Sequence, residues 1–248
     1  MPTARALVVQ HAEQEGPDRL AEWLPAAGVE LDIRHAYAGD QVRLPAGSVA
    51  GLLVMGGPMG ATDDADAPWL PDTRRILTEA VATGLPTLAI CLGAQLLAVA
   101  AGGAVRRGSA GPELGLDAVA PSPAAAEDRL LSSTGPVPVP VVQWHWDEVA
   151  ELPPGSVLLA GSARYPNQAF RVGRLAWGLQ FHLESSARTV ADWARIDADG
   201  VRAAGFDPAA LAAGVAAGEQ RLREVWQPVA ERFAGLVRDR AADRPSPP

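Results

Sequence analysis

The 248-residue sequence contains a single cysteine, Cys91. One cysteine cannot form an intramolecular disulfide, which excludes a small secreted fold held together by disulfides. It also cannot supply the several thiolates of a structural zinc site. We therefore expect neither a metal nor a cofactor, and any chemistry at Cys91 has to use a free thiol.

Long hydrophobic runs are also missing. No stretch reaches the roughly 18 apolar residues that cross a bilayer, and the short apolar run near the start lacks the features of a signal peptide. The net charge of −8 argues against nucleic acid or an anionic membrane as the main partner, because both attract basic patches. With 48% hydrophobic residues the chain has enough apolar side chains for a core, and we expect a folded cytoplasmic protein.

The first part of the chain alternates between short apolar strands and helices. Strands are predicted at residues 6–10, 29–33, 49–55 and 86–90, and helices at 18–27, 69–83 and 93–101. The strand at 49–55 is almost entirely apolar, as expected for a strand that is buried on both faces. This order predicts an α/β fold with a mostly parallel central sheet flanked by helices.

The second half contains closely spaced strands instead. They are predicted at residues 114–119, 137–142, 157–160, 169–172 and 175–181, and we expect them to extend the sheet by antiparallel pairing. The proline-rich segment 135–140 must lie at an edge or run extended, because proline has no N–H to donate to a neighbouring strand.

The chain from residue 187 onward is predicted to be helical. Apolar residues recur mostly every three to four positions between Leu211 and Leu236, and Pro228 is expected to kink this helix. We divide the chain into a main domain, 1–186, and a helical C-terminal extension, 187–248. The extension packs on the main domain or, as the alternative, binds a partner, and residues 244–248 are expected to form a frayed end.

Cys91 lies between the predicted strand at 86–90 and the helix that follows. Such a turn points the side chain into the crevice at the carboxyl end of the sheet, where ligands bind in open α/β folds. The start of the helix favours a thiolate, and its free backbone N–H groups can bind an oxyanion, with Leu92 as the obvious donor. A buried structural cysteine is the alternative, which the position of Cys91 alone does not exclude.

Two further segments support a nucleophilic role for Cys91. His182 and Glu184 end an apolar strand, and side chains two positions apart project from the same side of an extended segment, so Glu184 can orient His182. A glycine-rich turn at residues 55–60 follows another buried strand, and the N–H of Gly57 is a second candidate oxyanion donor. This turn lacks the Gly-Lys-Ser/Thr ending of a phosphate-binding loop.

These three segments together resemble the class I glutamine amidotransferase family. The family's Cys-x-Gly-x-Gln turn is matched by Cys-Leu-Gly-Ala-Gln at 91–95, its Gln-Phe-His-Pro-Glu segment by Gln-Phe-His-Leu-Glu at 180–184, and its glycine turn by Gly-Gly-Pro at 56–58. Order and spacing agree over residues 52–184, and Leu183 in place of the usual proline removes no functional atom. The resemblance implies a flavodoxin-like sheet and a Cys-His-Glu triad.

Carried over residue by residue, the resemblance makes Cys91 the nucleophile that attacks the side-chain amide of glutamine. His182 takes the thiol proton and delivers it to the departing ammonia, and Glu184 holds His182. The N–H groups of Gly57 and Leu92 stabilise the oxyanion.

The resemblance also implies residues that line the substrate pocket. Gly56 lies in the glycine turn, and Gln95 matches a family position that contacts bound glutamine. Residues 144–147 resemble a Trp-His-x-Asp segment of the family, so His145 either lines the pocket or is a structural histidine beside two tryptophans. Glu113 lies in a segment similar to the family's Glu-x-Gly, and we expect it to be structural or pocket-lining.

Three functions follow from this resemblance. The favoured one is a glutaminase that releases ammonia for a separate synthetase, because no nucleotide-binding loop or second catalytic domain is apparent in the chain. The first alternative is hydrolysis of γ-glutamyl peptides or conjugates. Cys91 would form a γ-glutamyl thioester in both reactions, and only the leaving amine would differ. The second alternative is a non-catalytic binding or regulatory protein, against which the complete triad argues.

Overall fold

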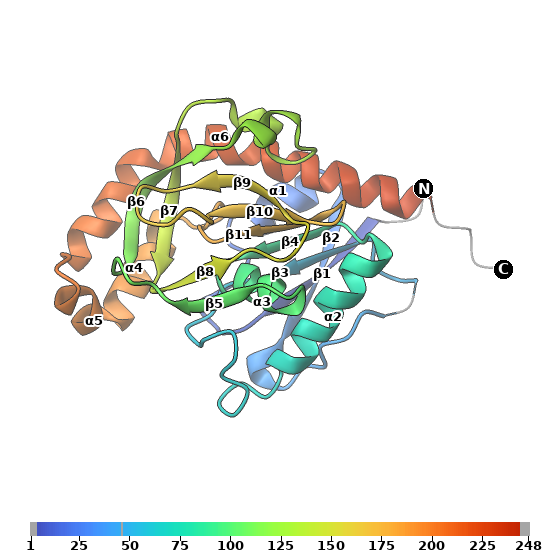
Figure 1. Ribbon diagram of the computed structural model, residues 1–248, viewed down its shortest axis with the longest axis horizontal. Coiled ribbons are helices and arrows are strands. Elements are labelled where there is room, and N and C mark those ends of the chain that lie inside the picture. The colour runs from blue at the N-terminus through green and yellow to red at the C-terminus, as the bar shows by residue number, and fades with distance from the viewer. Residues whose placement is uncertain (1–3, 46, 244–248) are drawn as a thin grey trace.

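The computed structural model of the protein describes residues 4–45 and 47–243. No helix in these two ranges is long and apolar enough to cross a membrane, and no cluster of three or more side chains there is suited to a metal ion. The frayed end expected at 244–248 lies outside the described residues. A nine-stranded sheet forms the centre of the described fold, with helices on both faces (Figure 1).

The first part of this sheet is parallel, as predicted. Its strands lie in the order β2 (Val29–His35), β1 (Ala4–Gln10), β3 (Gly51–Val54), β4 (Thr87–Ile90) and β11 (Ala176–Leu179). Strands β3, β4 and β11 are buried at every position because helices cover both faces of the sheet. The carboxyl ends of these three strands lie side by side, and each leads into one of the predicted site segments.

The strand predicted at 175–181 was expected to pair antiparallel, but β11 pairs parallel with β4 and antiparallel only with β10. Beyond β11, antiparallel strands extend the sheet, as predicted. They follow in the order β10 (Ala169–Val172), β9 (Val157–Gly161), β6 (Glu113–Pro121) and β7 (Val139–His145). Strand β7 contains Pro140 and is the last strand of the sheet, which is the edge position that proline requires. The strand predicted at 137–142 begins later and continues to His145, since Val137 is 57% exposed outside the sheet.

A second, two-stranded sheet was not predicted. Strands β5 (Ala104–Arg107) and β8 (Asp147–Glu151) pair antiparallel beside the main sheet. Both are short, and β5 is half-buried or exposed at each position, so neither has the apolar run that marks a strand in sequence. Arg107 and Asp147 lie at facing positions of this pair.

The helices cover the two faces of the main sheet. Helices α2 (Leu70–Thr83) and α3 (Leu92–Ala100) bury one face, and α1 (Leu20–Ala26), α4 (Ala187–Ile196) and α6 (Pro208–Ala242) bury the other. Helix α5 (Ala198–Ala203) connects α4 to α6. Side chains alternate between the two cores, as the period of a strand requires: Leu7 packs under α2 and α3, and Val8 packs under α6.

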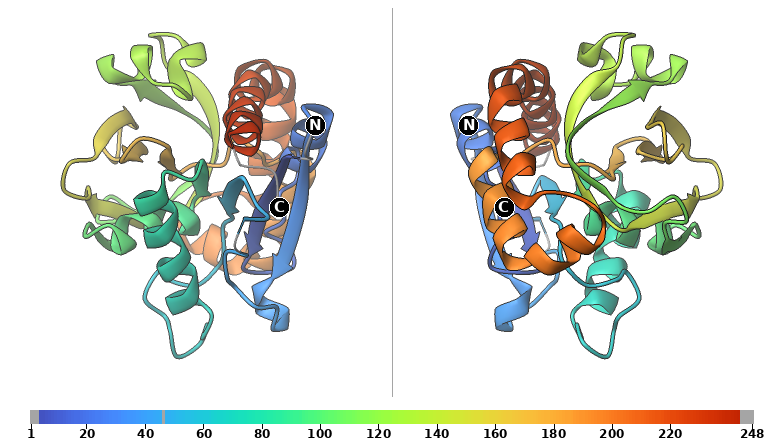
Figure 2. Two further views of the ribbon diagram at one scale, coloured as in Figure 1. Left: turned by 90° about the vertical axis from the view of Figure 1, so that its right-hand side faces the viewer. Right: turned by 90° about the vertical axis from the view of Figure 1, so that its left-hand side faces the viewer.

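The C-terminal helix α6 is part of the main core. It runs unbroken through Pro228 and lies between the N-terminal segment and the antiparallel strands, as both views of Figure 2 show. Its buried face includes Trp226 and Phe233, which pack in the same cluster as β1 and β3. The approach is close, because a Cβ atom added to Gly51 would lie only 2.6 Å from Cγ2 of Val237.

This packing predicts that Phe233→Ala lowers the free energy of unfolding by about 3–5 kcal/mol, because it removes a fully buried ring and leaves a cavity under the sheet. Urea unfolding followed by tryptophan fluorescence measures the change. The neighbouring Arg232→Ala, at an exposed position of the same helix, should change stability by less than about 0.5 kcal/mol. Equal stability of the two variants would show that α6 does not support the core.

Candidate active site

Cys91 occupies a sharp turn between β4 and α3. It is one of two non-glycine residues with positive φ in the described ranges, at φ 51° and ψ −109°, a conformation that costs on the order of 1–3 kcal/mol. The turn is held by the backbone N–H of Cys91, which donates to the carbonyl of Leu179 at 2.8 Å. It also depends on Gly93, where a Cβ atom would lie 2.2 Å from the carbonyl oxygen of Val54.

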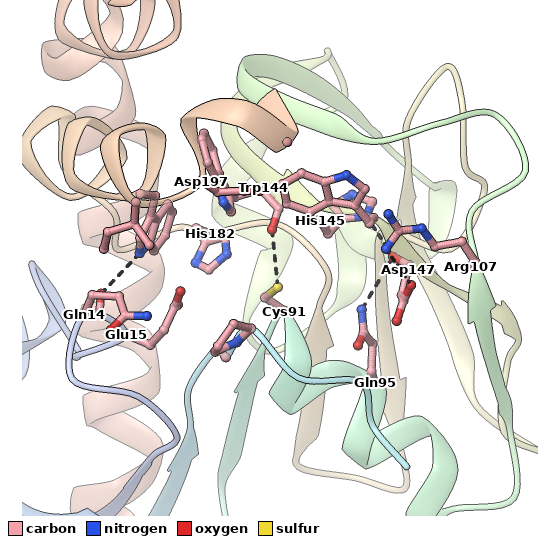
Figure 3. Close-up of a pocket in the computed structure, with 16 residues that line it drawn as sticks. Gln14, Glu15, Cys91, Gln95, Arg107, Trp144, His145, Asp147, His182 and Asp197 are labelled. Atoms are coloured by element: carbon pink, nitrogen blue, oxygen red, sulfur yellow. Dashed lines mark hydrogen bonds and ion pairs between the residues drawn. The ribbon is translucent and has the colours of Figure 1, made fainter. Parts of the chain in front are cut away.

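His182 and Glu184 follow β11 and lie beside this turn. The backbone of His182 pairs with Val142 of β7, and its N–H donates to the Val142 carbonyl at 2.8 Å. The Nδ1 of His182 lies 2.7 Å from Oε1 of Glu184. The Cys91 thiol lies close to the ring but donates its hydrogen bond to the carbonyl oxygen of Trp144, at 3.7 Å (Figure 3). Leu183 is buried in the core between them, so this contact forms without the family's proline.

The environment of His182 stabilises its protonated form. Burial by itself lowers the pKa of His182, but the charges of Glu184 and of a Cys91 thiolate, with the hydrogen bond to Glu184, raise it well above 6.5. Oε2 of Glu184 is buried without a hydrogen-bond partner among the described residues, so the carboxylate charge is left to act on the ring.

The glycine turn after β3 passes directly against this group. A Cβ atom at Gly56 would lie 3.1 Å from Cε1 of His182 and 3.6 Å from Cβ of Cys91. A Cβ atom at Gly57 would meet the side chain of Leu92 at 2.7 Å. Only glycine therefore lets the turn approach Cys91 this closely.

A cavity of about 460 Å³ opens over Cys91 (Figure 3), within the range typical of small-molecule sites. Of the residues singled out in the sequence, Gly57, Cys91, Gln95, His145 and His182 line it. Gly56, Leu92 and Glu184 are not among its lining residues.

Gln95 is held at the floor of this cavity. Its side-chain N–H donates to Oε1 of Gln180 at 3.2 Å and to the carbonyl of Asp147 at 3.5 Å. Gln180 in turn directs its amide towards Sγ of Cys91 at 3.9 Å. Gln180 is the first residue of the Gln-Phe-His-Leu-Glu segment at 180–184, but no role was predicted for it from the sequence.

Both ring nitrogens of His145 are engaged within the protein. Nδ1 lies 2.8 Å from the carbonyl oxygen of Asp147, and Nε2 lies 3.0 Å from Oε2 of Glu113. Glu113 also accepts hydrogen bonds from Ser162 at 2.6 Å and Gln168 at 2.6 Å. His145 therefore lines the cavity and is also fixed by a buried polar network, and Glu113 anchors that network.

Several residues that line the cavity were not predicted as site residues from the sequence. They are Gln14 and Glu15 from the loop after β1, Arg107 from the small sheet, and Trp193, Ile196 and Asp197 from α4 and the residue after it. Asp147 also lines the cavity and belongs to the Trp-His-x-Asp segment at 144–147. Burial raises the pKa of Glu15 to about 7, against the opposing effect of His182. No local pattern marks these residues, because they reach the site through loops and helices remote from it in sequence.

The aromatic ring of Trp193 covers the ring of His182. The two ring centroids lie 4.7 Å apart, and Trp144 is 5.6 Å from Trp193 on the other side. Nε1 of Trp193 donates to the carbonyl of Gln14 at 3.2 Å, which ties α4 to the loop after β1. The C-terminal helices thereby complete a wall of the cavity.

Known proteins share this architecture. The family model for glutamine amidotransferase class-I matches residues 18–192. The solved structure of a glutamine amidotransferase from Thermotoga maritima aligns with a TM-score of 0.84 and 28% identity, covering 94% of this chain and 98% of that one. This likeness confirms the predicted fold class.

Curated relatives differ in how much of their length is matched. A glutamine amidotransferase-like protein of Salmonella typhimurium is 28% identical over 75% of this chain and 78% of its own. A glutamine-hydrolyzing GMP synthase of Thermomicrobium roseum is 36% identical over 55% of this chain, but this is 24% of the synthase. Gamma-glutamyl peptidase 3 of Arabidopsis thaliana is 30% identical over 54% of this chain. The chain spans about half of that peptidase, with 54% matched, and about a quarter of the synthase.

The buried contact between His182 and Glu184 predicts that Glu184→Gln lowers the pKa of His182, because it removes a negative charge that favours the imidazolium. NMR titration of ring-labelled histidine measures this, with the His182 signal assigned from a His182→Asn variant. Glu13→Gln, a matched change at an exposed position, should leave the His182 titration unchanged. An unaltered His182 titration in Glu184→Gln would contradict the coupling.

Proposed function

The chain belongs to the class-I glutamine amidotransferase family, and on this premise we propose that it hydrolyses the γ-amide bond of a glutamyl substrate through a thioester on Cys91. The observation that supports the proposal most strongly is that Cys91 and His182 lie next to each other in the cavity wall, with Oε1 of Glu184 behind them, 2.7 Å from Nδ1 of His182. A nucleophile, a base and a group that orients the base are the parts that such chemistry needs.

The reaction has two steps. In the first, Sγ of Cys91 attacks the amide carbon, the C–N bond breaks, and His182 gives its proton to the leaving nitrogen. In the second, water attacks the thioester carbon, His182 accepts its proton, and the C–S bond breaks to release glutamate and restore the thiol. Glu184 keeps the ring of His182 oriented in both steps.

Two backbone groups suit the developing oxyanion. Leu92 is the first residue of α3, where backbone N–H groups have no partner within the helix. Gly57 lies against the Leu92 side chain in the turn after β3, so its N–H is the second proposed donor. Donors of this kind contribute on the order of 10²–10³ in rate each.

The side of the cavity beyond Gln95 suits the amino-acid end of the substrate. Arg107 offers a guanidinium to the α-carboxylate, and Asp147 offers a carboxylate to the α-ammonium group. The two side chains lie 3.6 Å apart, a spacing similar to that of the two charges they would bind. Gln95 and Gly57 of the glycine turn line the same cavity as these two side chains and Cys91.

Glutamine is the first substrate that we propose, with ammonia released for use by a separate enzyme. This role is supported by the similarity to GMP synthases that are named as glutamine-hydrolyzing, among them a synthase subunit from Methanoculleus marisnigri. A γ-glutamyl conjugate is the second candidate, supported by the similarity to gamma-glutamyl peptidases and by the space between His182 and Asp197. A purely regulatory role is disfavoured, because the chain keeps all three side chains of the proposed triad, with His182 bonded to Glu184 and lying beside Cys91.

The proposal predicts that the purified protein forms glutamate from glutamine or from a γ-glutamyl amide, and that Cys91→Ala lowers the rate by at least about 10³-fold, as loss of a nucleophile does in such triads. A coupled glutamate assay measures turnover, and circular dichroism checks that the variant is folded. Because Cys91 is the only cysteine, the electrophile diazo-oxo-norleucine should label one peptide. Equal turnover by the wild type and Cys91→Ala would refute the proposal.

A further inference from the structure

Cys91 separates the cavity into two unlike halves (Figure 3). Gln95, Arg107 and Asp147 lie on one side of the thiol, and Glu15, His182 and Asp197 lie on the other. Under the proposed function, His182 protonates the leaving nitrogen, so the departing amine must lie on the His182 side. We call this the amine side, lined by Gln14, Glu15, His182, Trp193 and Asp197.

The amine side is acidic. Glu15 reaches the catalytic group from the loop after β1: a Cβ atom at Gly56 would lie 2.7 Å from Oε2 of Glu15 and 3.1 Å from Cε1 of His182. Asp197 stands exposed at the mouth, where α4 ends and α5 begins. Among the described ion pairs, neither carboxylate has a lysine or arginine partner, whereas Asp147 on the opposite side lies 3.6 Å from Arg107.

The amine side is also aromatic. The indole of Trp193 lines this side, with its ring centroid 4.7 Å from that of His182 and its N–H bonded to the Gln14 carbonyl. Trp144 stands next to it at 5.6 Å. Indole faces beside carboxylates attract an organic cation, because the ring quadrupole and the negative charges act in the same direction.

From this arrangement we propose that the amine side selects γ-glutamyl amides whose amine portion carries a second, positively charged amino group. Glu15 binds that ammonium group when the amine is short, and Asp197 binds it when the amine is long enough to reach the mouth. Trp193 holds the alkyl chain between them. The inference rests on the proposed thioester chemistry and adds the class of leaving amine.

The protonation behaviour of Glu15 agrees with such a site. Burial raises its pKa to about 7, His182 lowers it, and Glu184 raises it again, while Asp197 at the mouth adds further negative potential. A carboxyl group that is partly neutral when the site is empty ionises when a cation enters, since the cation favours the charged form. A bound ammonium group would therefore add a second cationic neighbour to the one that His182 provides.

The test compares three γ-glutamyl amides of similar length, made from putrescine, butylamine and γ-aminobutyrate. We expect the putrescine amide to have a kcat/KM at least about tenfold higher than the butylamine amide, as one charge-assisted contact provides. The γ-aminobutyrate amide, with a negative end, should be the poorest substrate. A putrescine amide no better than the butylamine amide would overturn the inference.

Substitutions of Glu15 and Asp197 test whether these two carboxylates produce the preference for the putrescine amide. Glu15→Gln should reduce the putrescine-to-butylamine ratio of kcat/KM about tenfold, and Asp197→Asn should reduce it most for amides of longer diamines. The matched controls are Glu13→Gln in the same loop and Asp199→Asn in α5, both at exposed positions, and they should keep the wild-type ratio. An unchanged ratio in both Glu15→Gln and Asp197→Asn would also overturn the inference.

The two hypotheses fail in different ways. Turnover of the butylamine amide that depends on Cys91, with no preference for the putrescine amide, removes the inference and leaves the proposed function intact. Absence of turnover of glutamine and of all three amides, with no labelling of Cys91 by diazo-oxo-norleucine, removes both.

Discussion

The close contact between the backbones of β3, β4 and β11 at Cys91 is the constraint on which the site depends. Cys91 can hold its positive φ only because its N–H is bound by Leu179 and because Gly93 admits the Val54 carbonyl. The parallel pairing of these strands brings the glycine turn and His182 to the same edge. A shift of one strand along another would separate Cys91, His182 and the glycine turn. The burial of these strands on both faces, which fixes their register, therefore also fixes the relative positions of these three parts of the site.

Two buried histidine–glutamate pairs lie near this turn and differ in how fully they are hydrogen-bonded. His182 and Glu184 leave one carboxylate oxygen without a partner among the described residues, which keeps the charge available to the ring. His145 and Glu113 are instead surrounded by hydrogen bonds from Ser162 and Gln168. A satisfied network of this kind makes a rigid wall, whereas the less satisfied pair responds to charge at the thiol.

The C-terminal helices join the core and the site. Helix α6 buries Trp226 and Phe233 under the sheet, and α4 carries Trp193 onto His182. The cavity wall beside His182 is therefore built from parts of the chain that lie outside the three motifs. Because of this separation, substitutions in that wall can change the shape and charge of the cavity without altering the turn at Cys91.

Patterns in the sequence were enough to predict the succession of strands and helices, the parallel and antiparallel parts of the sheet, and the three segments that meet at the site. Apolar periodicity and glycine positions are local signals, and they mark Cys91, His182 and Glu184 because each of these residues follows or ends a buried strand. The folded chain was needed to show that Glu15, Arg107 and Trp193 join them. These residues come from a loop, a short half-exposed strand and a remote helix, and their proximity arises from packing between distant segments, for which no local pattern exists.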